Sequence, residues 1–177
     1  DRIIWYAGLA DKYGQLIGTV NNVQSGYFNF SIAEPTGVVG ILLPEEQPFL
    51  ALISRLCAVI TSGNSCIIIP SEKSPLAALT FSEIAATSDI PAGVVNILTG
   101  RKKELLPHLA SHMDVNAFDY ADSNSAFKKE VQTACANNVK RFVYSATADY
   151  YNDDKNENIL QVQNFTELKT VWHTMGL

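Results

Sequence analysis

Short apolar runs that alternate with amphipathic stretches of helical length are the feature that most constrains this chain. The run at residues 37–43 precedes residues 49–60, in which apolar side chains recur at the three- and four-residue intervals of a helix. Such alternation is typical of βαβ units, because parallel strands that carry helices on both faces are buried throughout. The pattern predicts an α/β fold built on a doubly wound, Rossmann-like parallel sheet.

The same alternation continues along the chain after a helical start at residues 3–13. Strands are expected at residues 37–43, 66–69, 93–98, 115–120 and 140–145, and helices at residues 49–60, 75–87, 102–112 and 125–137. Ser74 and Pro75 favour a helix start, because serine caps N-termini and proline fits the first turn.

Two segments depart from the βαβ pattern. Residues 16–33 show short apolar-polar alternations broken at Asn21-Asn22, which predicts an antiparallel β-hairpin. Residues 152–158 contain no apolar side chain and are expected to form a solvated linker. The chain is thereby divided into a Rossmann-like domain over residues 1–151 that includes the hairpin, the linker, and a C-terminal oligomerisation-type strand over residues 159–177.

Composition excludes several partners. Thirteen basic against eighteen acidic residues give a net charge of −5, and no basic cluster is larger than Arg101-Lys102-Lys103. A nucleic-acid or anionic-membrane surface is therefore not expected. No apolar run approaches the roughly twenty residues of a membrane-spanning helix. Three cysteines without a CxxC pair favour a reducing compartment, which predicts a cytoplasmic protein.

No catalytic or metal-binding set stands out from spacing alone. The phosphate-binding patterns GxGxxG and GxxxxGK[ST] are both absent. Glu104, His108 and His112 have metal-ligand spacing, but Pro107 interrupts their helix and no fourth ligand is evident, so no metal site is predicted. The three cysteines, Cys57, Cys66 and Cys135, are interpreted as packing residues.

Five motifs in order along the chain identify a family resemblance. They are EPTGVVG at residues 34–40, TSGN at 61–64, PSEKSP at 70–75, IPAGVVN at 90–96, and SHMD at 111–114. Residues 6–149 thereby resemble the cofactor-binding half of the aldehyde dehydrogenase superfamily. The tail NFTELKTVW, residues 164–172, resembles the strand that closes these enzymes and builds their subunit interfaces.

The resemblance implies that a domain is missing. In the family the catalytic domain with its nucleophilic cysteine lies between the stretches matched by residues 140–149 and by the closing strand, and here only residues 152–158 lie between them. This arrangement is most similar to the non-catalytic C-terminal region of family 16 aldehyde dehydrogenases. It implies a longer parent chain whose N-terminal, aldehyde dehydrogenase-like part is the partner of this domain, and a homo-oligomer.

Six positions correspond to those where the family binds cofactor or performs chemistry, and five of them carry other residues here. Glu46 replaces the amide that donates to the oxyanion, Ile69 replaces the ribose-binding lysine, and Ser145 falls at or beside the general base. Tyr120 and Ala121 replace the Gly-Ser under the pyrophosphate, and Glu72 keeps the acidic half of the ribose clamp.

A carboxylate repels an oxyanion, and serine accepts protons poorly at neutral pH. Tyr120 is expected to fill the space that glycine leaves open, and Asp119 and Asp122 to neutralise the helix end that attracts phosphate. The resemblance therefore implies no catalytic residue, no bound cofactor and no metal.

The leading hypothesis is a non-catalytic domain with a structural role in subunit or domain association. Its expected interface residues are Phe165, Leu168, Val171 and Trp172. Three alternatives stay open: the tail packs only on its own hairpin, the domain is regulatory and retains weak NAD(P) binding through Glu72, or another chain's cysteine completes a working dehydrogenase.

Overall fold

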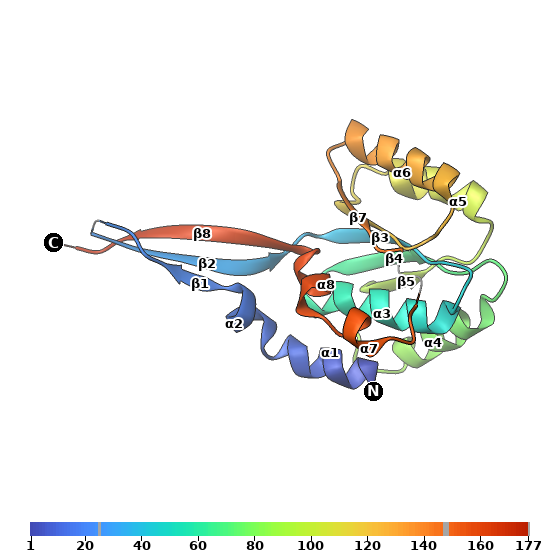
Figure 1. Ribbon diagram of the computed structural model, residues 1–177, viewed down its shortest axis with the longest axis horizontal. Coiled ribbons are helices and arrows are strands. Elements are labelled where there is room, and N and C mark those ends of the chain that lie inside the picture. The colour runs from blue at the N-terminus through green and yellow to red at the C-terminus, as the bar shows by residue number, and fades with distance from the viewer. Residues whose placement is uncertain (25, 147–148, 177) are drawn as a thin grey trace.

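The computed structural model describes residues 1–24, 26–146 and 149–176, and its centre is a five-stranded parallel sheet (Figure 1). The strands are β3 (Val38–Leu42), β4 (Ser65–Ile69), β5 (Val95–Ile97), β6 (Ala117–Tyr120) and β7 (Arg141–Tyr144). Their spatial order is β5-β4-β3-β6-β7, and each neighbouring pair is parallel. The predicted doubly wound, Rossmann-like sheet is confirmed.

Helices cover both faces of this sheet. The larger ones are α1 (Arg2–Ala10), α3 (Pro48–Thr61), α4 (Leu76–Ala86), α5 (Lys102–Ser111) and α6 (Ser125–Asn137), and the short ones are α2 (Tyr13–Ile17), α7 (Asp153–Asn156) and α8 (Ile159–Gln163). In Figure 1, α5 and α6 lie over one face, and α3 and α4 lie under the other. No helix among residues 1–24, 26–146 and 149–176 is long and apolar enough to cross a bilayer.

The side chains of β3 show how the strands divide the core between these two faces. Val39 and Ile41 pack in the cluster that contains Leu52 and Leu56 of α3. Leu42 points the other way and packs in the cluster with Leu106 of α5. Side chains alternate across a strand, so a continuous apolar run is needed where both faces are covered.

The remaining three strands form a separate antiparallel sheet, which we call the arm. It consists of β1 (Thr19–Asn21), β2 (Tyr27–Pro35) and β8 (Thr166–Thr174), in the order β1-β2-β8. β2 and β8 pair from Tyr27↔Thr174 to Pro35↔Thr166. The expected hairpin is therefore present, and the C-terminal strand completes its sheet. Figure 1 shows the arm projecting away from the parallel sheet.

The segment between β7 and β8 differs from the expected linker. Its polar residues form helix α7, in which the Asn152 side chain accepts a hydrogen bond from the Lys155 amide and Asn156 is buried. Residues 159–163 form helix α8 rather than strand, and Val162 packs against Tyr6. Asparagine caps helix N-termini well, which explains why a segment without apolar side chains is helical here.

Phe165 anchors the base of the arm. Its side chain is fully buried in the core cluster under β3, so the prediction that it lies at an interface between chains is wrong. Its carbonyl accepts a hydrogen bond from Asn64 Nδ2 at 2.8 Å, and Asn64 Oδ1 accepts one from the Gly37 amide at 2.8 Å. Two motifs of the family resemblance, those containing Asn64 and Gly37, thus join the arm to the parallel sheet.

Candidate functional site

The candidate site lies where β3 and β6 are neighbours in the parallel sheet. The chain runs outward from β3 to β4 and β5, and returns to the other side of β3 as β6 and β7. Ligands of open α/β sheets bind beyond the carboxyl ends of the strands at such a point. A cavity of about 360 Å³ lies there, lined by Pro44, Glu46, Gln47, Ala121, Ser123, Tyr144, Ala146 and Tyr150.

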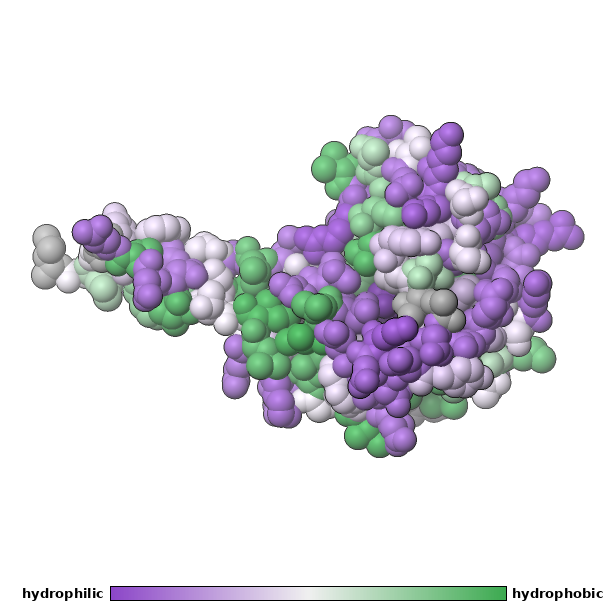
Figure 2. Space-filling view, in the orientation of Figure 1, coloured by the Kyte–Doolittle hydropathy of each residue, from purple (hydrophilic) through white to green (hydrophobic). Residues whose placement is uncertain are grey.

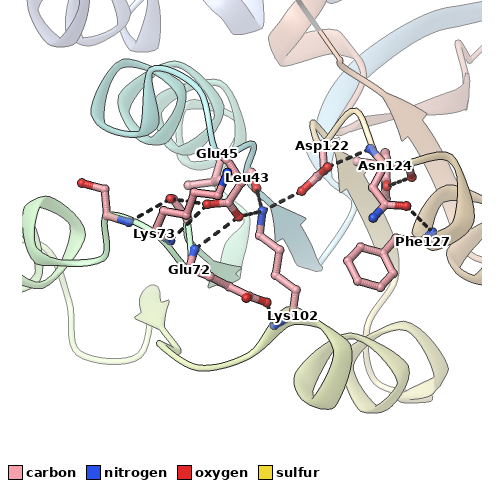
Figure 3. A network of polar contacts seen from close by, with 11 residues as sticks. Leu43, Glu45, Glu72, Lys73, Lys102, Asp122, Asn124 and Phe127 are labelled. Atoms are coloured by element: carbon pink, nitrogen blue, oxygen red, sulfur yellow. Dashed lines mark hydrogen bonds and ion pairs between the residues drawn. The ribbon is translucent and has the colours of Figure 1, made fainter.

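Lys102, the first residue of α5, reaches into this carboxyl edge (Figure 3). Its ammonium group contacts the carbonyl of Leu43 at 2.6 Å, Asp122 Oδ2 at 2.6 Å and Glu45 Oε1 at 2.5 Å. A lysine ammonium has three N–H donors, and three oxygens surround this one. Only 3% of the Lys102 side chain is exposed, so the group is bound by the protein itself.

Glu45 connects this cluster to the loop after β4. Its carboxylate accepts hydrogen bonds from Ser71 Oγ at 2.6 Å and from the Lys73 amide at 3.1 Å, besides its contact with Lys102. Burial pushes the pKa of Glu45 upward, but the hydrogen bonds from Lys102 and Ser71 outweigh it and lower the pKa to about 2. Glu45 is therefore ionised at neutral pH.

Glu72 has a partner inside the protein as well. Its carboxylate accepts a hydrogen bond from the backbone amide of Lys102, at the N-terminus of α5 (Figure 3). Helix N-termini attract negative charge and leave amides without partners, so this acid stabilises α5. The structure thus places Glu72, the predicted half of a ribose clamp, at a helix N-terminus.

Tyr120 ends β6 and is buried among side chains of α5 and α6. Its hydroxyl donates to the carbonyl of Asn124, and its ring lies 6.3 Å from the ring of Tyr144, stacked against it. The aromatic side chain therefore fills the space beneath the N-terminus of α6. Ala121, the next residue, lines the cavity.

The two aspartates that flank Tyr120 lie in different surroundings. Asp122 accepts a hydrogen bond from the Asn124 amide at 2.8 Å, so it stands at the start of α6 as the sequence predicts. The corresponding prediction for Asp119 is wrong. Asp119 is fully buried, and its Oδ2 lies 2.6 Å from Nε of Arg55 on α3. Successive side chains of a strand point to opposite faces, so Asp119 points away from Tyr120.

Sequence reasoning missed two of the chain's buried cations, Arg55 and Lys102. Arg55 is 2% exposed and also donates to Gln161 Oε1 of α8 at 2.7 Å, so it ties α3 to β6 and α8. A signal was available in each case. Arg55 is the one charged residue of an otherwise apolar helix, and Lys102 opens a helix, a position that favours acids.

The three cysteines, Cys57, Cys66 and Cys135, lie in the buried core. Burial raises the pKa of both Cys57 and Cys66 to about 12, and it also raises the pKa of Cys135. A thiol, not a thiolate, is therefore present at neutral pH, and these side chains are inert packing groups. Among the residues that the structure describes, no group of His, Cys, Asp and Glu could hold a metal ion.

Comparison with known proteins shows to which family the chain belongs. A model described as the aldehyde dehydrogenase family matches residues 1–148. The chain belongs to the aldehyde dehydrogenase family. It is 34% identical over 139 residues to the NADP/NAD-dependent aldehyde dehydrogenase PuuC of Escherichia coli K12, covering 78% of this chain and 28% of that protein. It is 32% identical over 138 residues to omega-crystallin of Enteroctopus dofleini, covering 77% and 27%.

Solved aldehyde dehydrogenase structures share the fold. The gamma-glutamyl-gamma-aminobutyraldehyde dehydrogenase of Burkholderia cenocepacia J2315 is 33% identical with a TM-score of 0.73, covering 80% of this chain and 28% of that one. The NAD+ complex of an aldehyde dehydrogenase from Bacillus cereus is 25% identical with a TM-score of 0.73, covering 78% and 27%. The chain thus spans little more than a quarter of the length of these relatives.

The three other positions singled out by the aldehyde dehydrogenase resemblance are spread across this edge. Glu46 is exposed on the rim of the cavity. Ile69 is fully buried at the end of β4, where it packs with Leu106 and Phe118. Ser145 is buried after β7, and its amide donates to the Tyr120 carbonyl at 2.8 Å. The structure therefore brings Glu46 to the cavity and gives Ile69 a place in the core.

A dinucleotide does not fit the charges of this edge. Its pyrophosphate is anionic, whereas Glu45 and Asp122 present two carboxylates against one ammonium group, that of Lys102. The ammonium already contacts three protein oxygens, and Glu46 adds a further carboxylate on the rim. An anion that approaches Lys102 meets repulsion from these carboxylates. A cationic group beside the cavity is that of Lys128, which lies 3.5 Å from the centroid of the Tyr144 ring on the cavity wall.

Proposed function

We propose that this is a non-catalytic aldehyde dehydrogenase-like domain whose arm mediates subunit or domain association within a larger protein. The observation that carries the proposal is the closure of the carboxyl edge by Lys102, Glu45 and Asp122. A site that holds a cofactor keeps such an edge open and complementary in charge. Here the chain's own charged groups occupy the part of the edge beside the cavity.

Several residues together support a domain without catalytic chemistry. The position of the oxyanion donor carries Glu46, and the position of the general base carries Ser145 or its neighbour. The buried cysteines have raised pKa values and lie in the core. Loss of one oxyanion donor costs about 2.7–4 kcal/mol of transition-state stabilisation. We therefore expect no aldehyde oxidation by the isolated chain with NAD+ or NADP+.

The association role is supported by the exposed apolar side chains of the arm. Leu168 and Trp172 on β8 are 54% and 61% exposed. Val171 of the predicted interface set is half-buried. Figure 2 shows apolar surface on the arm and where it joins the rest of the molecule. Exposed apolar side chains that gather on one element mark an interaction surface.

We further propose family 16 as the subfamily, since α7 and α8 are the only helices among the residues described between β7 and β8. The partner in that proposal is an N-terminal aldehyde dehydrogenase-like part of the parent chain, in a homo-oligomer. Three cysteines that are all free support a cytoplasmic location.

Light scattering tests the association role. We expect a mass above the 19.4 kDa of one chain, and a return to one chain in the variant with Leu168→Asp and Trp172→Asp. Ile84→Asp on α4 is the matched control, because Ile84 is 59% exposed and lies away from the arm. A monomeric wild type, or an assembly that the double variant leaves intact, contradicts association of subunits through the arm.

The alternative function, a regulatory domain with weak NAD(P) affinity, is favoured by one feature. A groove of about 660 Å³ runs between α5 and α6, and it is lined by Pro107, Ala110, Ser111, Ala126, Lys129, Glu130, Thr133, Ala134 and Asn137. The structure from Bacillus cereus, which shares this fold, is an NAD+ complex. Calorimetric titration with NAD+ and NADP+ separates the two functions: saturable heat supports the alternative, and no heat at millimolar cofactor excludes it.

A further inference from the structure

Ser74 precedes helix α4 but does not cap it. The sequence favours Ser74 as the cap, whereas in the structure Pro75 takes that position and no side chain caps the helix. The Ser74 amide donates to Ser71 Oγ at 3.1 Å, and no group in the described part of the chain forms a hydrogen bond with the Ser74 hydroxyl. Because the residue is also exposed, this hydroxyl is accessible to another molecule.

The residue that follows Ser74 is proline, and no other serine or threonine of the chain has that neighbour. Protein kinases that are directed by proline bind the residue after the serine in a pocket that offers a backbone N–H no partner. Proline has no N–H to leave unsatisfied, so these enzymes prefer it at that position. The chain therefore contains one serine of the kind that such kinases modify.

The backbone around Ser74 suits the extended conformation in which kinases bind their substrates. Residues 70–75 form neither helix nor strand, and α4 begins at Leu76. The residue before a proline is disfavoured in helical conformation and favours an extended one. Lys73 and Leu76, on the two sides of the Ser74-Pro75 dipeptide, are both exposed. The segment is thus presented at the surface without a strand or helix to unfold before it.

We propose that Ser74 is a phosphorylation site for a proline-directed serine/threonine kinase. In this step the Ser74 hydroxyl oxygen forms a bond to the γ-phosphorus of ATP, and the bond from that phosphorus to the bridging oxygen of ADP breaks. The hydroxyl proton passes to the catalytic carboxylate of the kinase. The products are ADP and a phosphoserine at position 74.

The surroundings of Ser74 can accommodate the phosphate. A phosphoserine carries a charge of about −1.5 to −2. This charge would lie beside the first turn of α4, which contains no acidic side chain. Glu45 accepts a hydrogen bond from the Lys73 amide at 3.1 Å, but its own charge is compensated by the ammonium group of Lys102 (Figure 3). The phosphorylated chain is therefore expected to stay folded.

The site is also compatible with the association role, on which this proposal does not depend. Figure 1 shows α4 at the end of the molecule opposite to the tip of the arm. A kinase that binds residues 70–76 therefore approaches a different part of the molecule from the exposed apolar side chains of β8.

Phosphorylation of the full chain tests the site. The chain is incubated with Mg²⁺ and ATP and either a cyclin-dependent or a mitogen-activated protein kinase, and peptide mass spectrometry locates the phosphate. We expect one phosphoryl group per chain, at Ser74, and none in the Ser74→Ala variant. Pro75→Ala should be phosphorylated at least several-fold more slowly than the wild type, because it restores the backbone N–H.

Ser88 provides a matched control just beyond the other end of α4. It is exposed like Ser74, but Asp89 follows it and its hydroxyl donates to the Ala85 carbonyl at 2.8 Å. Ser88→Ala should therefore be phosphorylated at the rate of the wild type. Circular dichroism before and after the reaction measures whether the chain is folded when it is modified.

Three results overturn the proposal. One is a folded chain that receives no phosphate at Ser74 from either kinase, and another is a Pro75→Ala variant that is modified as fast as the wild type. The third is phosphate at Ser74 only in chains that have lost the circular dichroism signal of the fold, because the folded structure then does not present this hydroxyl.

Discussion

Lys102 is the residue on which the closed carboxyl edge depends. Its ammonium group bridges β3, through Leu43 and Glu45, to Asp122 at the start of α6. Replacing one partner of a buried ion pair leaves the others charged and without a counter-ion, which costs more than the pair itself contributes.

We expect Lys102→Met to lower the free energy of unfolding by about 3–5 kcal/mol, since two carboxylates and a carbonyl lose their shared donor. Urea unfolding followed by circular dichroism measures the loss. Lys103→Met is the control: Lys103 is the exposed neighbour, and its substitution should change stability by no more than about 0.5 kcal/mol. Similar losses in the two variants would contradict the account.

Glu45 makes stability depend on pH. Its pKa in the folded chain is about 2, below the ordinary value of 4.5, so the ionised form stabilises the fold. The sign follows from linkage: the contribution is complete above pH 4.5 and is lost as the pH falls from 4.5 to about 2. We expect Glu45→Gln to reduce stability at pH 6 by about 1.5–3 kcal/mol and to flatten this part of the curve. Urea unfolding of the wild type and of the variant between pH 6 and pH 2 measures this dependence. If the free energy of unfolding changes with pH in parallel for the two proteins, the role of Glu45 is refuted.

At the scale of elements, Arg55 holds three of them together. It extends from α3 to the buried Asp119 on β6 and to the half-buried Gln161 on α8. The pair is not fully satisfied, because Arg55 Nη2 and Asp119 Oδ1 have no hydrogen-bond partner in the structure. We expect a buried pair of this kind to contribute specificity to the packing more than net stability.

We expect Arg55→Met alone to destabilise the chain by about 3–5 kcal/mol, since Asp119 stays buried and charged. Arg55→Met combined with Asp119→Leu should recover most of that loss, because no buried charge remains. Thermal unfolding of the two variants makes the comparison. A double variant less stable than the single one would show that the pair itself stabilises the fold.

The elements that the sequence predicts best are those with local signals. The five parallel strands coincide with apolar runs, and α3, α4, α5 and α6 lie within two residues of the expected bounds. The errors arise where distant residues decide. From the sequence alone Phe165 is predicted to be an interface residue, because the sequence does not show its contacts with Asn64 and with the core under β3. Asp119 and Asp122 are close in the sequence and have the same side chain. Strand geometry directs these side chains to different partners, Arg55 for Asp119 and Lys102 for Asp122. Lys102 and Arg55 have partners far along the chain, so a pattern of neighbouring residues cannot predict their ion pairs.

At the scale of the whole molecule, the two sheets carry different features. Figure 1 shows the arm projecting from the parallel sheet. The parallel sheet has a carboxyl edge partly occupied by its own charged groups, and the arm carries exposed apolar side chains and a free strand edge. A hydrogen bond from Asn64 to the Phe165 carbonyl connects the two. This division supports a protein in which the family scaffold positions an association surface.

Soaking crystals of the chain with NAD+ tests the central claim most directly, because it reports where a dinucleotide lies. We expect the region over Tyr120 and Ala121 to contain no ordered nucleotide, with Lys102 still bound to Glu45 and Asp122. Ordered NAD+ density over Tyr120, with its pyrophosphate at the start of α6, would contradict the account.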